Sequence, residues 1–288
     1  MQEHETEYEY EPFAQTEEYQ RVNREIVHGW VNTIVSQGAG GIRALVDVAC
    51  GVGTMAKLFL ESLPAAWPRP VVTLVDMSPK AIEQARVRVE PEATSVDSIC
   101  ARVQDVELPQ AGYDVAIWGN GIHYLTADEQ EAALSRLRPA IREGGWFLFN
   151  SAFTDESRPP ETLPFYRAQI AKAVRYLQSR GIRRERVEAR PSSSTFLPAE
   201  YYADLLSRVG FSVQEIRSVA AQLYQTAWEH ISGFTQYATG ALHGYGAEVA
   251  SQAMRYAVGP AIEEYGARDA EDRPYIQRNW LAAVARVV

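Results

Sequence analysis

Three aspartates and one glycine turn are the residues of this chain whose types and spacing could do chemistry. The segment VDVACGVGT, from Val46 to Thr54, is an apolar run that contains Asp47 and ends in a turn with Gly51 and Gly53. Glycines let a backbone approach a ligand closely, and a helix that begins after such a turn presents unpaired N–H groups. Taken alone this pattern is weak, and it gains weight only from the acids that follow.

Acidic residues follow the next two predicted strands. Asp76 ends the apolar run Val71–Val75, and Asp105 ends a weaker run that we place at Ser98–Val103. The carboxyl ends of successive parallel strands lie along one edge of a sheet, where α/β proteins bind ligands. An acid at the end of the second strand can accept both hydroxyls of a ribose. An acid after the third can accept an exocyclic amine of adenine, so these side chains predict a nucleoside site.

The elements that must position these residues alternate between strands and helices, which predicts a parallel sheet with right-handed crossovers. Ser78-Pro79 and the capping-box pattern from Thr126 to Glu129 mark two helix starts. We expect strands at 44–48, 71–75, 98–103, 113–118 and 146–150, and helices at 15–35, 55–63, 78–89 and 126–141.

The regular alternation loosens after Phe153. We expect helices at 165–180 and 198–209, strands at 211–220 and 281–288, and helical patterns at 227–241 and 248–265. A connection as long as 225–279 is usually a lid or a substrate element. We expect an acidic, flexible tail at 1–14 and a single domain at 15–288, with an N-terminal helical cap (15–41), a core (42–153) and substrate-cap segments (154–200 and 225–279).

Composition excludes several classes of function. A net charge of −9 disfavours nucleic acid as a partner, because phosphate contacts need a basic surface. Two cysteines, Cys50 and Cys100, cannot form a disulfide framework, and we expect both to be buried. The five histidines lack ligand spacing, so no metal site is expected. No segment is apolar enough to span a membrane, so no membrane partner and a cytoplasmic location are expected.

At this point the chain resembles the class I S-adenosylmethionine-dependent methyltransferases. The matching segments follow the family's order and approximate spacing from about Leu45 to Asn150: VDVACGVGT at 46–54, LVDMS at 74–78, QDV at 104–106 and YDVAIWGNGIHYL at 113–125. The resemblance implies a Rossmann-like, doubly wound sheet of seven strands, mostly parallel with an antiparallel last strand. The N-terminal helix and the late helical insertion would then form a lid.

The resemblance also implies residue roles towards S-adenosylmethionine. Gly51 and Gly53 would border its methionine part, Asp76 would bind the ribose, and Asp105 with Val106 would hold the adenine. The family often has glycine at the position of Ala49, so the turn is less free here. The remaining expected cofactor contacts are Asp47, Ala49, Cys50, Met77, which would pack on the adenine, Gln104, Trp118, Gly119 and Asn120. Trp118 could instead fill the core.

Methyl transfer from a sulfonium is an in-line displacement, and a hydroxyl acceptor must also lose a proton. His123 and Tyr124 follow the fourth strand, where such chemistry would occur. Histidine has an unperturbed pKa that suits a general base near neutrality. Relatives of different chemistry carry a histidine at this position, however, so a purely structural role for His123 is the stronger alternative.

The acceptor must be recognised by segments outside the sheet, where aromatic residues are dense. We expect Tyr19, Asn23 and Trp30 from the N-terminal helix, and Trp228 and Phe234 from the late insertion, to contact it. Such stripes are usually plain core. Their density nevertheless suggests an apolar or aromatic acceptor, such as a natural product of secondary metabolism, modified on oxygen or carbon.

Three alternatives remain from the sequence. A nicotinamide-dependent Rossmann enzyme also carries an acid after its second strand, but its turn usually needs a third glycine where this chain has Ala56. The same fold and cofactor could instead serve another reaction, such as a cyclisation. The chain could also be a non-catalytic subunit that binds S-adenosylmethionine. The sequence leaves the oligomeric state open, with a homodimer among the options.

Overall fold

The computed structural model describes residues 11–185 and 196–288 and groups the chain into two compact units. Unit 1 takes its described residues from segments 1–20, 155–196 and 220–279. Unit 2 takes them from segments 21–154, 197–219 and 280–288. No helix within the described ranges is long and apolar enough to cross a bilayer.

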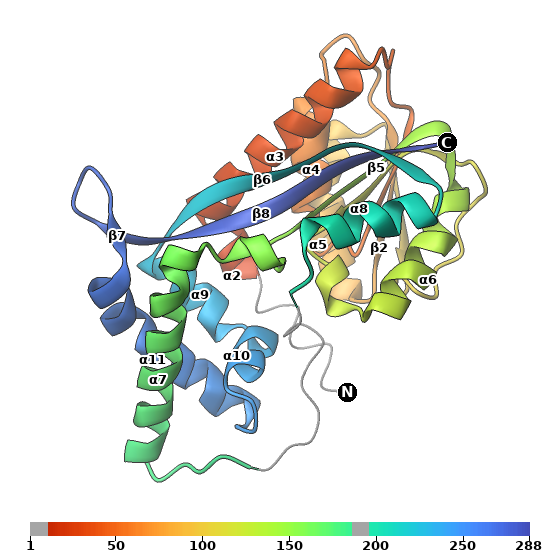
Figure 1. The fold of residues 1–288 in the computed structure, drawn as a ribbon. Helices are drawn as coiled ribbons and strands as arrows, with labels where there is room; N and C mark the ends of the chain where they lie inside the picture. The colour runs from red at the N-terminus through yellow and green to blue at the C-terminus, as the bar shows by residue number, and fades with distance from the viewer. Residues whose placement is uncertain (1–10, 186–195) are drawn as a thin grey trace. The chain divides into compact units, whose positions relative to one another are not determined.

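One sheet carries the fold, with the strand order β3-β2-β1-β4-β5-β8-β6 and β7 paired to β8 (Figure 1). The first five strands are parallel, whereas β8 runs antiparallel to β5. The expected seven-stranded, mostly parallel α/β sheet with an antiparallel last strand is therefore confirmed. The strands are β1 Ala44–Val48, β2 Val71–Asp76, β3 Ser95–Cys100, β4 Tyr113–Gly119, β5 Ile141–Ser151, β6 Phe211–Tyr224, β7 Ala267–Arg268 and β8 Pro274–Val287.

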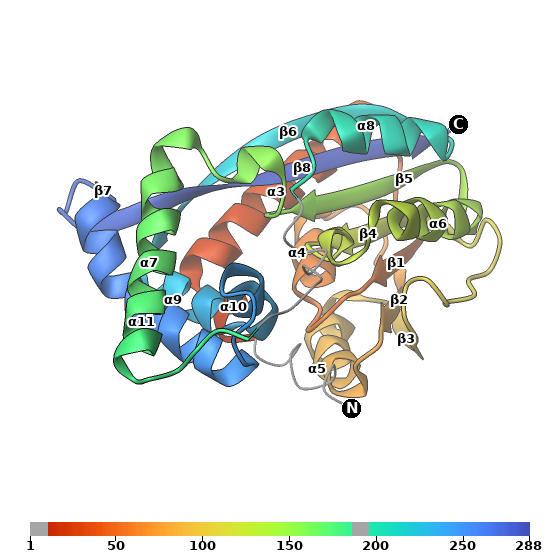
Figure 2. The same ribbon diagram turned by 60° about the horizontal axis from the view of Figure 1, so that its bottom comes forward.

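Helices pack against the sheet in unit 2. α6 (Ala127–Leu137) and α8 (Ala199–Arg208) bury their apolar faces against alternate residues of β1, β4 and β5 (Figure 2). α4 (Thr54–Ser62) and α5 (Pro79–Val89) contact β4 and β2, and none of their buried side chains belongs to that cluster. Because successive side chains of a strand point to opposite faces, both faces of a parallel sheet need such cover.

Local signals in the sequence place several helix starts. The Ser78 side chain accepts the Ala81 N–H at the start of α5, with Pro79 in the first turn. Thr126 and Glu129 form the reciprocal capping box of α6. α3 (Glu17–Ser36) buries an apolar stripe that runs from Tyr19 to Ile34, and all of these features confirm the predictions.

Other boundaries differ from the prediction. β3 begins at Ser95 and ends at Cys100, three residues before the predicted strand end, because this edge strand has no buried side chain to mark it. Cys100 is consequently exposed, so the prediction of two buried thiols was wrong for this one. β8 begins at Pro274 rather than Leu281. The single helix expected at 227–241 is two helices, because Phe234 has extended backbone.

Unit 1 is mainly helical. α7 (Leu163–Ser179) packs against α11 (Ala247–Tyr265), which also contacts α9 (Gln225–Gly233) and α10 (Thr235–Ala241). Part of the expected tail is ordered, since Glu11–Ala14 forms α2 with Phe13 and Ala14 buried. Residues 1–10 of that tail, and residues 186–195 of the expected cap segment 154–200, lie outside the described residues.

Candidate cofactor site at the carboxyl edge of the sheet

The turn after β1 alternates between left-handed and ordinary backbone. Ala49, Gly51 and Gly53 have φ angles of 51°, 51° and 78°. Gly53 is the N-cap of α4, and no side chain caps this helix end. Ala49 therefore occupies a conformation that glycine adopts without strain. The turn leaves the first N–H groups of α4 available for a ligand.

Asp76 holds this turn from the neighbouring strand. Its Oδ2 accepts the Gly51 N–H at 2.8 Å, and its Oδ1 accepts the Ser78 N–H at 2.9 Å. The Cys50 N–H donates to the Val75 carbonyl at 3.0 Å. The acid at the end of the second strand thus lies directly beside the glycine turn, as the sequence predicted from the strand order.

Asp47 is a completely buried acid behind the turn. Neither of its carboxyl oxygens makes a hydrogen bond with the described residues. Burial raises the pKa of the Asp47 carboxyl to about 8, and the nearby Asp76 charge adds to this rise. The nearby Ala56 amide lowers the pKa of Asp47 in part, although it does not form a hydrogen bond with the carboxyl group. An orphan acid of this kind favours a positively charged ligand nearby.

The two glycines of the turn have different surroundings. A Cβ on Gly53 would lie 2.9 Å from both Cα and Cβ of Ala85 in α5, so this glycine allows α4 and α5 to pack. A Cβ on Gly51 would meet nothing within 4 Å among the described residues. Gly51 therefore faces space that a ligand could fill, whereas Gly53 faces protein.

Three asparagines tie the end of β4 to its neighbours. Asn120, with a φ of 47°, donates its N–H to the Asn150 side chain at 2.8 Å and accepts the Ala152 N–H at 2.9 Å. Asn150 donates to the Asn23 side chain on α3 at 2.7 Å. Asn23 and Asn150 are both completely buried. Asn23, which the sequence suggested as an acceptor contact, is thus tied to the end of β5.

His123 lies in a short 3₁₀ turn after β4 and is 2% exposed. Its Nδ1 is 3.2 Å from the Ser151 Oγ, and its ring stacks on Phe153 with 4.0 Å between ring centroids. The ring of Tyr124 is tilted against it at 4.2 Å. The imidazole is therefore held in a fixed orientation at the sheet edge that carries the glycine turn.

The expected adenine residues lie on the loop after β3. Asp105 is exposed five residues past the strand end, with 3.8 Å between its Oδ2 and the Arg102 Nε, so it does not end the strand as predicted. Val106 is buried, and Gln104 and Met77 are half-buried. Trp118 is completely buried in the core of unit 2. The cofactor contacts of all these residues stay predictions.

The expected acceptor residues divide between the two units. In unit 2, Trp30 is 1% exposed. In unit 1, Tyr19 packs on Phe13, and Trp228 is fully buried. Phe234, also in unit 1, is 6% exposed at the break between α9 and α10. Each of these side chains is part of a packed interior, and their contact with an acceptor stays a prediction.

Sequence reasoning missed Asn150 and Ser151, which position Asn120 and His123. Both stand at the carboxyl end of β5, the same edge as the predicted site. The rule that parallel strands end along one edge could have found them. No group of three or more His, Cys, Asp or Glu side chains that could hold a metal gathers within the described ranges.

The sequence matches known methyltransferases over its central part. Residues 45–145 match the family model described as "Methyltransferase domain". A malonyl-[acyl-carrier protein] O-methyltransferase of Anoxybacillus flavithermus is 28% identical over 48% of this chain and 48% of its own length. The corresponding enzyme of Acetivibrio thermocellus is 36% identical over 37% of this chain and 35% of its own. The matched region thus spans half or less of these relatives.

Solved structures extend the likeness in fold. The [4+2]-cyclase SpnF has a TM-score of 0.52 at 17% identity, covering 93% of this chain and 81% of its own. The YcgJ protein of Bacillus subtilis has a TM-score of 0.52 at 11% identity, covering 90% of this chain and 98% of its own. Residues 45–145, with the glycine turn and the acids of β1 and β2, are a methyltransferase domain of the class I S-adenosylmethionine-dependent family.

Proposed function

We propose that this chain is an S-adenosylmethionine-dependent methyltransferase that acts on a small acceptor. The observation that carries the proposal is the turn after β1, where Asp47 is an orphan acid and Gly51 faces open space. S-adenosylmethionine carries a sulfonium and an ammonium group. Their positive charge would stabilise the ionised form of Asp47, which otherwise has a raised pKa.

Residues around the turn would hold the cofactor. The backbone from Ala49 to Gly53 would cradle its methionine part, and Asp76 would accept the ribose hydroxyls while it keeps the turn in place. Asp105 and Val106, with Met77 and Gln104, would enclose the adenine. Gly119 and Asn120 at the end of β4 would border the reacting end of the molecule.

The bound cofactor supplies an electrophilic methyl group, so the protein's task is to align the acceptor and to take up its proton. For a hydroxyl acceptor, His123 would take up the proton that the oxygen loses when it receives the methyl group, and S-adenosylhomocysteine would be the second product. Ser151 and Phe153 would hold the imidazole for that transfer. Tyr124 would border the acceptor on the same turn.

The acceptor is a small molecule with an apolar or aromatic body, methylated on oxygen or carbon. The aromatic residues of α9 and α10 support this class. The relatives named malonyl-[acyl-carrier protein] O-methyltransferase favour oxygen over carbon, because their names give O-methylation as the activity.

Calorimetric titration with S-adenosylmethionine is the first test of the proposal. We expect binding to the wild-type protein and a loss of about tenfold or more in affinity for Asp76→Ala. Incubation with panels of hydroxylated and carboxylated acceptors should then form S-adenosylhomocysteine. Absence of cofactor binding would refute the proposal, and binding without turnover on any acceptor would favour a cyclase or a non-catalytic subunit.

His123→Ala tests the base. We expect a fall in kcat of about a hundredfold or more, with the cofactor Kd within about twofold of wild type. A structural role for His123 would instead lower the unfolding temperature and raise KM, with kcat recovering at low temperature. Phe153→Leu, which removes the stacked ring and keeps the imidazole, is the matched control for packing.

A further inference from the structure

Unit 1 contains two arginines around one buried tyrosine. Arg278 on β8 is 2% exposed, and its Nη1 donates to the Tyr166 hydroxyl at 3.1 Å. The Arg158 guanidinium carbon lies 5.7 Å from the centroid of the same tyrosine ring and 3.7 Å from that of Phe196. The Arg278 guanidinium carbon is also 5.9 Å from the Trp228 ring. Two cationic groups thus share one aromatic, largely dry surrounding.

The charge of Arg158 is poorly compensated by the protein. Burial and the neighbouring Arg278 lower the pKa of Arg158, and the exposed Asp155 is the one carboxylate that opposes this effect within the described residues. The Arg158 Nε is buried and finds no hydrogen-bond partner among those residues. Arg158 is half-buried, and a cation whose buried Nε–H has no acceptor is costly unless an anion completes its surroundings.

Two further hydrogen-bond donors belong to the same group, one on the buried Trp228 and one on the half-buried Tyr237. The Trp228 Nε1 has no hydrogen-bond partner in the described part of the chain. Burial and Tyr166 raise the pKa of Tyr237 on α10, so its phenol stays protonated and can donate a hydrogen bond. We call Arg158, Tyr166, Trp228, Tyr237 and Arg278 the arginine cluster. An anion with several oxygens suits this cluster, because its oxygens can accept hydrogen bonds both from the arginine guanidinium groups and from the neutral donors.

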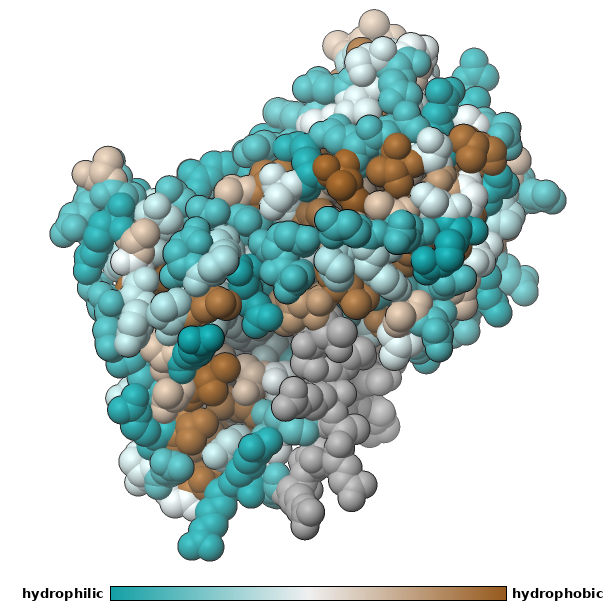
Figure 3. All heavy atoms as spheres, viewed as in Figure 1, coloured by the Kyte–Doolittle hydropathy of each residue, from teal (hydrophilic) through white to brown (hydrophobic). Residues whose placement is uncertain are grey.

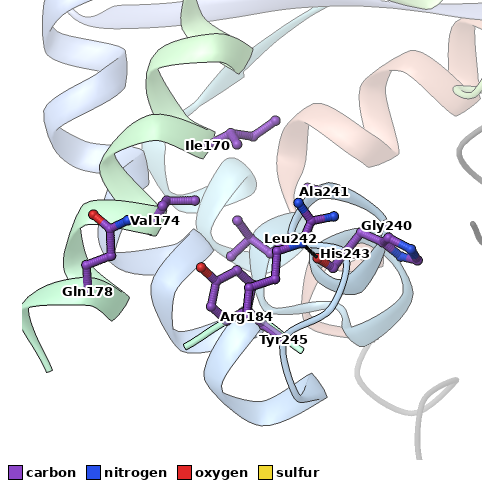
Figure 4. Close-up of a pocket in the computed structure, with 9 residues that line it drawn as sticks. All are labelled: Ile170, Val174, Gln178, Arg184, Gly240, Ala241, Leu242, His243 and Tyr245. Atoms are coloured by element: carbon purple, nitrogen blue, oxygen red, sulfur yellow. Dashed lines mark hydrogen bonds between the residues drawn. The ribbon is translucent and has the colours of Figure 1, made fainter. Parts of the chain in front are cut away.

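A cavity of about 560 Å³, lined by both apolar and polar side chains, lies in the same unit. Ile170, Val174 and Gln178 of α7 line one side, and the residues around Leu242 that end α10 line another, with Arg184 between them (Figure 4). Ile170 is a 37% exposed aliphatic side chain. Hydrophobic residues gather over α7 and α10 on the face shown in Figure 3. The cavity has the size range of small-molecule pockets.

Residues of the arginine cluster and of the cavity lining lie on the same two helices, α7 and α10. On α7, Tyr166 is one turn before Ile170 and two turns before Val174, so the three lie on one face. On α10, Tyr237 is one turn before Ala241, which lines the cavity. Tyr237 also packs against the apolar cluster that includes Leu242. A ligand that extends along these two helices would meet charge at one end and apolar side chains beyond it.

We propose that unit 1 binds an amphipathic oxyanion, a molecule whose carboxylate or phosphate group sits in the arginine cluster and whose apolar body lies in the cavity. Binding is a property of this unit and does not depend on the proposed methyl transfer. That this ligand is the methyl acceptor rests on the proposed function. A purely structural arginine cluster would show no preference for an anion on an alkyl chain.

Calorimetry without cofactor tests the proposal with three probes of equal chain length: octanoate, octyl phosphate and octanol. We expect the anions to bind at least about tenfold more tightly than octanol. Arg158→Gln should weaken the anions about tenfold and leave octanol unchanged. Val174→Trp, which fills the cavity, should weaken all three. If only one anion responds, the proposal stands and that group is the one recognised.

Arg167→Gln is the matched control, because it removes the same charge from an exposed position of α7, next to Tyr166. The affinities of Arg167→Gln for the three probes should equal those of the wild type. Arg158→Lys, which keeps the positive charge, should recover part of the anion affinity that Arg158→Gln loses. Thermal unfolding of each variant checks that the fold persists. Binding of both anions no tighter than that of octanol, or equal losses in both glutamine variants, would overturn the inference, whereas missing cofactor binding would overturn only the proposed function.

Discussion

At the scale of single residues, Asp47 is the group that most distinguishes this site. Its folded-state pKa of about 8 lies above the ordinary value of 3.8. At a pH between these two pKa values, the Asp47 carboxyl is ionised in the unfolded chain but protonated in the folded chain. The free energy of unfolding therefore falls as the pH rises from about 4 to about 8, by at most about 1.4 kcal/mol per pH unit. Below pH 4 both states are protonated and the effect vanishes.

Asp47→Asn should remove this dependence. We expect the ligand-free variant to be more stable than the wild type at pH 8, with the difference closing towards pH 4 in urea unfolding. Titration of the wild type with S-adenosylmethionine at pH 7, in buffers of different ionisation enthalpy, should reveal release of up to one proton, because the cationic ligand lowers the pKa of Asp47. Equal proton release by the variant would show that another group titrates.

Gly51 and Gly53 separate ligand binding from packing. Gly53→Ala places a Cβ against Ala85 at a φ of 78° and should cost about 2–4 kcal/mol of stability. Gly51→Ala meets open space at a φ of 51°, so we expect a cost of only about 1 kcal/mol. Its cofactor Kd should nevertheless rise about tenfold or more. Urea unfolding and calorimetry measure both, and normal cofactor affinity in Gly51→Ala would mean that the turn faces away from the ligand.

At the scale of elements, the sequence predicted those strands, helix caps and buried faces that depend on residues close to one another in the chain. Strand β1, the caps at Ser78 and Thr126 and the buried stripe of α3 depend on neighbours in sequence. The edge strand β3 was misplaced because half-buried alternation is weak there. The break at Phe234 was missed because the buried residues on both sides, Ile231 and Ala238, kept a helical spacing.

The candidate site likewise combines contacts that the sequence predicted with contacts that it did not predict. The order of the strands was enough to predict that Asp76 and the glycine turn meet. The positive φ of Ala49 agrees with the expectation that glycine would suit this position better. The Asn23–Asn150 bond joins residues 127 positions apart, and no periodicity of the chain reports such a pair. The roles of the site residues towards a cofactor stay predictions.

The link between α3 and β5 gives a prediction for these two elements. Asn23→Ala and Asn150→Ala should each cost about 1–3 kcal/mol, because each leaves a buried amide without its partner. The double variant should cost less than the sum, with a coupling of about 1 kcal/mol or more. Asn150→Ala should also weaken cofactor binding, since Asn150 accepts the Asn120 N–H. Strict additivity in urea unfolding would show that the pair is not coupled.

At the scale of the whole molecule, the chain passes repeatedly between its two units. Strand β6 lies in unit 2 up to Val219 and in unit 1 from Ala220, and β8 enters unit 2 at Trp280. The sequence predicted a lid formed by the N-terminal helix and the late helical insertion, with cap segments at 15–41, 154–200 and 225–279. Among the described residues, 11–20 group with the segments 155–196 and 220–279, whereas the rest of α3 belongs to unit 2. Neither unit is a continuous stretch of chain, so neither can be produced by simple truncation.

Shared strands should make the two units unfold together. Strands β6 and β8 each have residues in both units, so we expect the slowest-exchanging amides of α11 in unit 1 and of β4 in unit 2 to report one global transition. S-adenosylhomocysteine at about a hundred times its Kd stabilises its site by about 2.7 kcal/mol and should slow both sets of amides about a hundredfold. Hydrogen exchange followed by mass spectrometry measures this. Gly51→Ala, at the same ligand concentration, should show a smaller slowing in both elements, because that concentration is a smaller multiple of the variant's Kd. Slowing confined to β4 would mean that α11 opens independently and that cofactor binding does not stabilise unit 1.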